Sequence, residues 1–282
     1  MKTLTLIFLF LSVVGTNTAP VSISDAVKQN KIKIKTSFNQ LGKEGIALSL
    51  TNPRTQAITL KIPAGTIFHP ESGEEQTLMN VEEMLVSLAP QQTKKINTGG
   101  YCTMLTKHCP KNQNTFKIEE TNNEKLLSFI DFLKTNKVSP DNYQAAIWAL
   151  TDNEEISSIL PLTEADKKLR EHIAKLTNRK NPWYSSEQQI QAEQGRPIQR
   201  NRIDIQGELF VKLQENTEFT VSVENAASEV KLEMPGTHLI EKNVENSFSF
   251  KVSVKGWEIG KYSVVLRKKS NKAKIAFYDF NV

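Results

Sequence analysis

The stretch "KIKIKTSFNQLGKEGIALSL" (residues 31–50) alternates apolar residues with polar or charged ones. The apolar positions repeat every second residue, at Ile32, Ile34 and Phe38 and again at Ile46, Leu48 and Leu50. Because successive side chains of a strand point to opposite faces, this spacing gathers the apolar residues on one face. It predicts strands of an antiparallel sheet that packs its apolar face on a second layer.

The same alternation continues toward the middle of the chain. It is present in "AITLKIPAGTIF" (57–68) and in "EEMLVSLAPQQTKKINTGGYCTML" (82–105). Two glycines, Gly99 and Gly100, stand directly before Tyr101 and Cys102. Glycine tolerates backbone conformations that other residues avoid, so the pair predicts a sharp bend at this point.

Beyond residue 120 the apolar spacing changes to three or four residues, which is typical of helices. Helices are predicted within residues 122–136, 139–152 and 162–176. The first begins after an asparagine cap, and Thr163 with Asp166 resembles a capping box at the start of the third. We expect this helical group to pack against the first sheet.

The second half of the chain returns to a period of two. Residues 181–204 are polar, rich in glutamine and contain two prolines, so they predict a linker. Residues 205–282 hold six or seven short alternating runs, which predict an Ig-like β-sandwich. The chain is therefore predicted to be mainly β with a small helical part, in two domains: 20–180, a β-sandwich with appended helices, and 205–282.

The N-terminus "MKTLTLIFLFLSVVGTNTAP" (residues 1–20) has one lysine, an apolar run and then small polar residues. This layout is typical of a secretory signal peptide, here residues 1–19. We expect a secreted protein, extracellular, at the cell surface or periplasmic, and no transmembrane segment is predicted after the signal. In such an oxidising compartment two cysteines pair by default.

The formal charge of +5 is spread over several short lysine and arginine runs. Nucleic-acid binding calls for clustered basic residues with stacking aromatics, so no nucleic-acid partner is expected. The four histidines, at 69, 108, 172 and 238, lack metal-ligand spacing, and no phosphate-binding loop occurs. The sequence thus predicts neither a metal nor a cofactor.

Both cysteines lie in "GGYCTMLTKHCP" (99–110), and Cys102 has two candidate partners. A disulfide with Cys109 closes a short loop and would stabilise the fold by about 2–3 kcal/mol. A Cys–His hydrolase pair with His108 is disfavoured, because such pairs are normally distant in sequence. The other partner lies in a later helix.

That helix contains "NYQAAIWALTD" (142–152), with Gln144 in its first turn. Unpaired N–H groups at a helix N-terminus would polarise an acyl oxygen placed beside them. Trp148, one turn later, lies on the same face and would cover Gln144 from water. The plainer interpretation is that the helix forms a core stripe and Gln144 hydrogen-bonds locally.

The pairing of "YCT" (101–103) with "QAAIW" (144–148) resembles the thioester domains of bacterial surface adhesins. The resemblance implies a β-sandwich with helices, in which the Cys102 sulfur and the Gln144 side-chain carbonyl condense to an internal thioester with loss of ammonia. Tyr101 and Trp148 would be the flanking aromatics. The C-terminal "GKYSVVLRKKSNKAKIAFYDFNV" resembles an Ig-like or fibronectin-like module and is loosely similar to Bacteroidetes sorting domains.

Two functions follow from these alternatives. In the first, the protein is an adhesin that captures a protein or glycan ligand through an amine or hydroxyl, reacting once and not turning over as an enzyme. In the second, it is a non-covalent extracellular binding or structural module with a Cys102–Cys109 disulfide. The partner of Cys102 distinguishes the two.

Overall fold

The computed structural model describes residues 19–282, so all but the last residue of the predicted signal peptide lies outside the described residues. Strands make up 44% of the chain and helices 18%, which confirms the mainly β class. Within residues 19–282 no helix is long and apolar enough to cross a membrane.

The N-terminal part is built from two sheets that share a core. The larger sheet has the order β2 (Lys33–Phe38), β3 (Gly42–Thr51), β8 (Thr93–Cys102), β6 (Leu78–Met79), β5 (Thr66–Pro70), β9 (Phe116–Glu120), all antiparallel. The smaller sheet is β1 (Val21–Ser22), β4 (Ile58–Ile62), β7 (Met84–Leu88). Leu48 of β3 and Leu60 of β4 belong to one buried cluster, as expected for the apolar face of residues 31–50. A short helix that the sequence did not predict, α1 (Ile23–Lys28), adds Ile23 to this core.

The predicted bend at Gly99 and Gly100 is wrong. Both residues lie inside β8, and neither has a positive φ. They are needed for close approach: a Cβ on Gly100 would lie 2.9 Å from the Cα of Gly45, and one on Gly99 would lie 2.9 Å from Oδ1 of Asn80. Strand β8 therefore continues as a strand to Cys102.

Replacing Gly100 with alanine should lower the free energy of unfolding by about 1–3 kcal/mol, because the added methyl meets backbone that cannot easily move. Urea denaturation measures this loss. Gly73→Ala is the matched control, since a Cβ at Gly73 meets nothing within 4 Å. Equal stability of the two variants would show that β3 and β8 can separate without cost.

The predicted helices are all present. They are α2 (Glu124–Thr135), α3 (Tyr143–Thr151) and α4 (Glu164–Thr177), with short 3-10 turns η1 (Pro140–Asn142) and η2 (Ile156–Ser158). Asn123 caps α2, and Thr163 with Asp166 forms the capping box of α4. Their buried side chains share a cluster with Tyr101 of β8, so the group packs against the first sheet as expected.

The C-terminal part also has two sheets around one core. One sheet is β10 (Tyr184–Gln191), β11 (Gln199–Val211), β15 (Asn246–Ser253). The other is β13 (Val230–Glu233), β12 (Thr217–Asn225), β16 (Lys261–Lys268), β17 (Lys274–Asn281), with β14 (His238–Ile240) also paired to β12. Residues from both sheets, including Ile205 and Val264, form a single buried cluster.

The linker predicted for residues 181–204 is wrong in its local structure. Most of these residues form β10 and the first part of β11, which pair as an antiparallel hairpin. The stretch is polar because the far end of this hairpin extends beyond the C-terminal core, where backbone pairing and polar side-chain contacts hold it. Trp183 is not part of a free segment either, since its ring packs against Tyr184, Phe250 and Tyr278.

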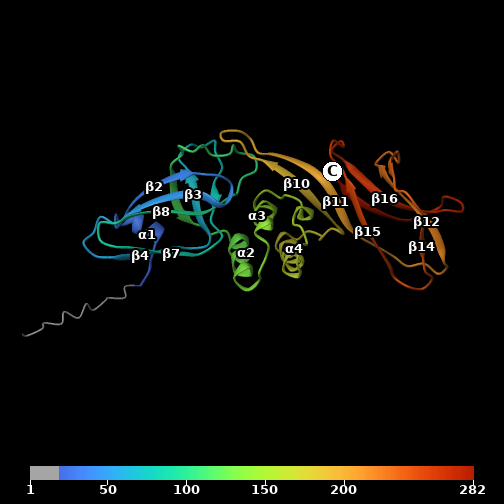
Figure 1. Ribbon diagram of the computed structural model, residues 1–282, viewed down its shortest axis with the longest axis horizontal. Helices are drawn as coiled ribbons and strands as arrows, with labels where there is room; N and C mark the ends of the chain where they lie inside the picture. The colour runs from blue at the N-terminus through green and yellow to red at the C-terminus, as the bar shows by residue number, and fades with distance from the viewer. Residues whose placement is uncertain (1–18) are drawn as a thin grey trace, which may run out of the picture.

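The molecule is elongated, with the N-terminal sheets at one end, the helices in the middle and the C-terminal strands at the other end (Figure 1). The hairpin β10–β11 runs from the C-terminal strands past α3 and α4 toward the N-terminal sheets (Figure 1). Its turn meets the segment around Cys109, where Cys109 N–H donates to Arg196 O at 2.8 Å and Gly195 N–H donates to Cys109 O at 2.8 Å. The hairpin thus connects the two ends of the molecule.

Candidate functional site

Cys102 is the last residue of β8 and is fully buried. Leu78 of β6 pairs with it on one side. Burial raises the pKa of the Cys102 thiol well above its ordinary value, and nearby Cys109 and Asp152 raise it further. The sulfur is therefore a protonated, shielded thiol at neutral pH unless it is bonded to something else.

The start of α3 is held by a buried polar network. Asn142, which directly precedes the helix, exchanges hydrogen bonds with the main chain of Leu160 at 2.7 and 2.8 Å and donates to Asp166 at 2.9 Å. Asp166 also accepts from the Ser139 N–H at 2.9 Å. These contacts fix the first turn of α3, and Gln144 is the second residue of that turn.

Gln144 pairs with the main chain of Cys102. Its Oε1 accepts from the Cys102 N–H at 2.9 Å, and its Nε2 donates to the Cys102 carbonyl at 2.9 Å. Two hydrogen bonds from the Gln144 amide to one residue fix both the distance of the amide from Cys102 and its orientation. The structure therefore brings together the two residues that the sequence motifs single out, and the side chain of Gln144 stays half-buried.

Aromatic side chains flank this pair. The rings of Tyr101 and Tyr143 meet edge-to-face with centroids 5.7 Å apart. Trp148 is 1% exposed and belongs to the same buried cluster as Cys102 and Cys109. Its indole N–H has no hydrogen-bond partner among the described residues. Trp148 is thus buried in the same core as Cys102, and its cover of Gln144 stays a prediction.

The hairpin β10–β11 supplies a part of the site that sequence reasoning missed. The guanidinium carbon of Arg200 lies 5.7 Å from the centroid of the Trp148 ring, and Arg200 also forms an ion pair with Glu154. Ile198 of the hairpin packs against the cluster that contains Cys102. No local signal in the polar stretch 181–204 indicates these contacts, because they depend on the strand pairing of β10 with β11.

Cys109 is a second buried cysteine, and both cysteines are free thiols in the structure. Burial raises the pKa of the Cys109 thiol to about 11. Hydrogen bonds from both of its main-chain groups attach it to the hairpin turn. Cys109 lies in the same buried cluster as Cys102, and it makes no hydrogen bond to Gln144.

Cys109 should be alkylated by iodoacetamide at pH 8 about a hundredfold more slowly in the folded than in the unfolded protein, because a pKa of about 11 in place of 9.0 reduces the reactive thiolate. Peptide mapping after timed labelling, in native buffer and in urea, measures the ratio. A disulfide would block labelling in both conditions until reductant is added, and equal native and unfolded rates would contradict the buried thiol.

The other candidate residues do not come together. His69 lies beside Lys117 on β5 and β9, His172 stacks on Phe132, and His238 packs on Phe219. Among residues 19–282 no group of three His, Cys, Asp or Glu side chains is placed to hold a metal ion.

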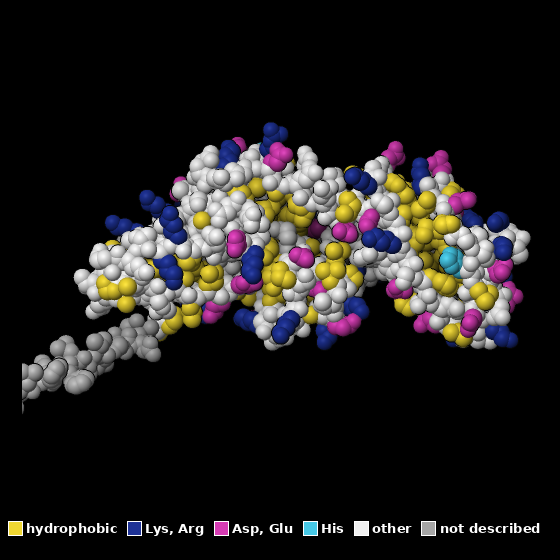
Figure 2. Space-filling model, in the orientation of Figure 1, with side chains coloured by type: hydrophobic (Ala, Val, Ile, Leu, Met, Phe, Trp, Pro, Cys, Tyr) yellow, Lys and Arg dark blue, Asp and Glu magenta, His cyan; other side chains and the backbone are white. Residues whose placement is uncertain are grey.

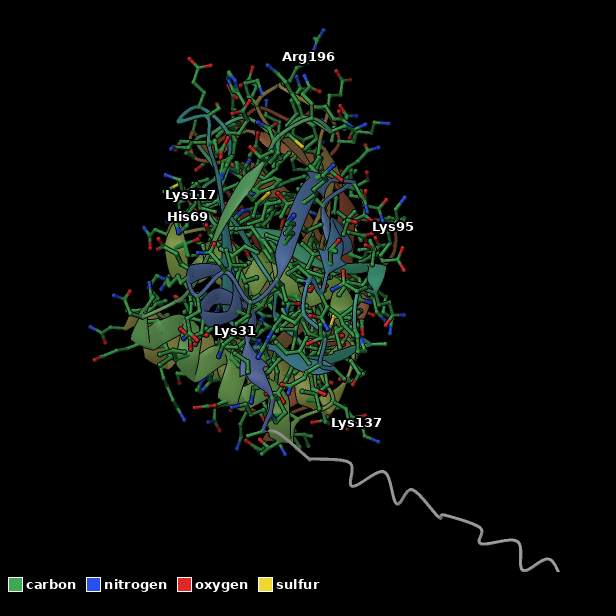
Figure 3. The ribbon with its side chains drawn as sticks, turned by 90° about the vertical axis from the view of Figure 1, so that its left-hand side faces the viewer. Lys31, His69, Lys95, Lys117, Lys137 and Arg196 are labelled. Atoms are coloured by element: carbon green, nitrogen blue, oxygen red, sulfur yellow. The ribbon has the colours of Figure 1, made fainter. Side chains whose placement is uncertain are left out.

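Basic residues are also spread apart. Figure 3 shows Lys31, Lys95, Lys137 and Arg196 at separate places on the end view of the molecule. On the face drawn in Figure 2 lysine and arginine side chains alternate with acidic ones. The charge pattern is that of solvated strand and helix faces.

No protein-family model matches the chain, and no curated protein matches it either.

Proposed function

We propose that the protein captures a ligand covalently through an internal thioester between Cys102 and Gln144. The observation that carries this proposal is the double hydrogen bond between the Gln144 amide and the Cys102 main chain. In the bond-forming step the Cys102 sulfur adds to the Gln144 side-chain carbonyl carbon. The C–N bond then breaks, and the amide nitrogen leaves as ammonia with the thiol proton.

The main chain of Cys102 contacts both ends of the Gln144 amide. Its N–H already donates to Oε1 of Gln144 at 2.9 Å, so a developing oxyanion has a fixed donor. The sequence predicted helix N–H groups for this role, and the geometry favours the Cys102 N–H instead. When ammonia leaves, the Cys102 carbonyl loses the Nε2–H donor that it has in the amide form.

Burial explains how such a bond would persist until a ligand arrives. Cys102 and Trp148 are both buried, which keeps water from the sulfur side of the acyl group. Gln144 is half-buried, so this residue stays partly accessible to a ligand. A primary amine entering there would form an amide with the Gln144 carbonyl and release the Cys102 thiol.

The capture chemistry fits a secreted adhesin. An amine or hydroxyl of a protein or glycan surface would be the nucleophile, and each molecule would react once. The signal-like N-terminus supports a location outside the cytoplasm, where such surfaces are found.

Intact-mass measurement of the purified protein under denaturing conditions tests the proposal. We expect a mass one ammonia lower than the amide form, and a gain of one methylamine after incubation with that amine. A mass lower by two hydrogens, restored by reductant and unaffected by methylamine, would instead indicate a Cys102–Cys109 disulfide and exclude the thioester.

A further inference from the structure

Arg200 of the hairpin lies over the ring of Trp148, which belongs to the same buried cluster as both cysteines. Its guanidinium carbon is 5.7 Å from the ring centroid, within the range of a cation–π contact. Arg200 also pairs with Glu154, whose main-chain N–H donates to the carbonyl of Trp148 at 3.1 Å. Arg200 thus contacts the segment 148–154 at two points. Its guanidinium lies over the Trp148 ring, and it pairs with Glu154 just after α3.

The partner of Arg200 is a well-anchored carboxylate. The Glu154 side chain is 10% exposed and accepts from Gln188 at 3.1 Å. Burial raises the pKa of Glu154, but the hydrogen bonds donated by Arg200 and Gln188 outweigh this effect and leave the pKa below its ordinary value. The carboxylate therefore remains charged at neutral pH and keeps Arg200 in place.

Arg200 nevertheless has space to move. Its side chain is 30% exposed and lines an open cleft of about 530 Å³ between the hairpin and the loop that carries Trp257 and Ile259. Arg200 therefore borders open space, whereas Trp148 is 1% exposed and does not line the cleft.

We propose that Arg200 is a specificity-determining residue that limits the size of the nucleophile reaching the Cys102–Gln144 acyl group. The inference rests on the proposed thioester. In this proposal a small amine reaches the half-buried Gln144 directly, whereas a bulky amine needs the ring of Trp148, one helical turn away, to shift. That shift would require Arg200 to leave the ring for the cleft.

The test compares two primary amines, methylamine and dansylcadaverine, by the rate at which each adds to the purified full chain in intact-mass spectra. Arg200→Gln should raise the ratio of the dansylcadaverine rate to the methylamine rate about tenfold, as expected for loss of a cation–π contact and a buried ion pair. Arg202→Gln is the matched control. Arg202 lies on the same strand, lines the same cleft and pairs with Glu155 at 3.1 Å.

A third variant separates the stacking role from simple destabilisation. Arg200→Lys keeps the charge for Glu154 but loses the planar group, so its rate ratio should also rise while its melting temperature stays near that of the natural chain. General loosening would accelerate both amines equally and leave the ratio unchanged.

The outcomes are distinct. An unchanged ratio in the Arg200 variants, or an equal rise in Arg202→Gln, overturns the role of Arg200 and leaves the thioester intact. A natural chain that shows no loss of ammonia before amine is added overturns the proposed function, and the role of Arg200 with it.

Discussion

Gln144→Ala and Cys102→Ala should each abolish methylamine addition and covalent ligand capture, and each variant should have its full calculated mass with no ammonia lost. In the proposed thioester the acyl group comes from Gln144 and the leaving thiol from Cys102, so neither residue has a substitute. The expected effect is complete loss, measured by intact mass after incubation with methylamine.

The two variants should differ in stability. Gln144→Ala removes both hydrogen bonds that the amide form makes to Cys102, or the one to the N–H that the thioester keeps. The N–H and carbonyl of Cys102 lie at a buried strand end. Leaving such groups without partners costs about 1–3 kcal/mol, which urea denaturation would detect. Cys102→Ala leaves the Gln144 amide free to make both main-chain bonds, and it loses the sulfur and with it the thioester cross-link.

Two controls make the result specific. Cys109→Ser should still add methylamine, because the proposed reaction does not use Cys109. Gln92→Ala changes a glutamine of an exposed turn, where its Oε1 accepts from the Ala89 N–H. Methylamine addition that survives in Gln144→Ala would show that the acyl group comes from another residue.

Asp166→Asn should destabilise the fold by about 2–4 kcal/mol and also lower the fraction of chains that form the thioester. Asp166 is fully buried and accepts from Ser139, Asn142 and Thr163, three of the contacts that fix the helix starts. An asparagine cannot accept all of these bonds, and a buried donor left unpaired is costly. Urea denaturation and intact mass report the two effects.

The same carboxylate predicts an acid-sensitive component of stability. Burial raises the pKa of Asp166, but the hydrogen bonds from Thr163, Ser139 and Asn142 outweigh it, so the folded pKa lies below the ordinary 3.8. A group with a lowered folded pKa stabilises the fold above the unfolded value, and this contribution is lost as pH falls through the folded value. Stability should therefore drop below about pH 4, less steeply in Asp166→Asn.

Asp131→Asn is the control for both measurements, because Asp131 pairs with Lys134 on the exposed side of α2. We expect its stability to change by less than about 0.5 kcal/mol. If Asp166→Asn behaves like Asp131→Asn, the network does not position the start of α3.

Local chemistry predicted much of this fold. The period-two runs of residues 31–50 became β2 and β3, and the caps Asn123 and Thr163 begin helices where expected. These features depend on residues that are neighbours in the sequence, so the sequence alone predicts them. The contact of Cys102 with Gln144 followed from a motif resemblance and not from spacing.

What sequence reasoning missed depends on distant partners. Position 100 requires glycine because Gly45 of the neighbouring strand β3 approaches it closely, and no local sequence pattern indicates that approach. Arg200 lies in a polar run whose strand character comes from pairing with β10, so it looked like part of a linker. Asp166 looked like a simple helix cap, although it also accepts hydrogen bonds from two residues at the start of the preceding helix.

The hairpin β10–β11 has a mechanical consequence. A single stretch of chain, residues 178–183, joins α4 to β10. This connection alone would hold the helices and the C-terminal sheets together only weakly. The hairpin instead lies along the helices and is fastened by Arg200–Glu154, Arg202–Glu155 and the main chain of Cys109 (Figure 1). A force that pulls the two ends of the molecule apart acts on all of these contacts at once. The N-terminal and C-terminal parts should therefore separate only when several contacts break together.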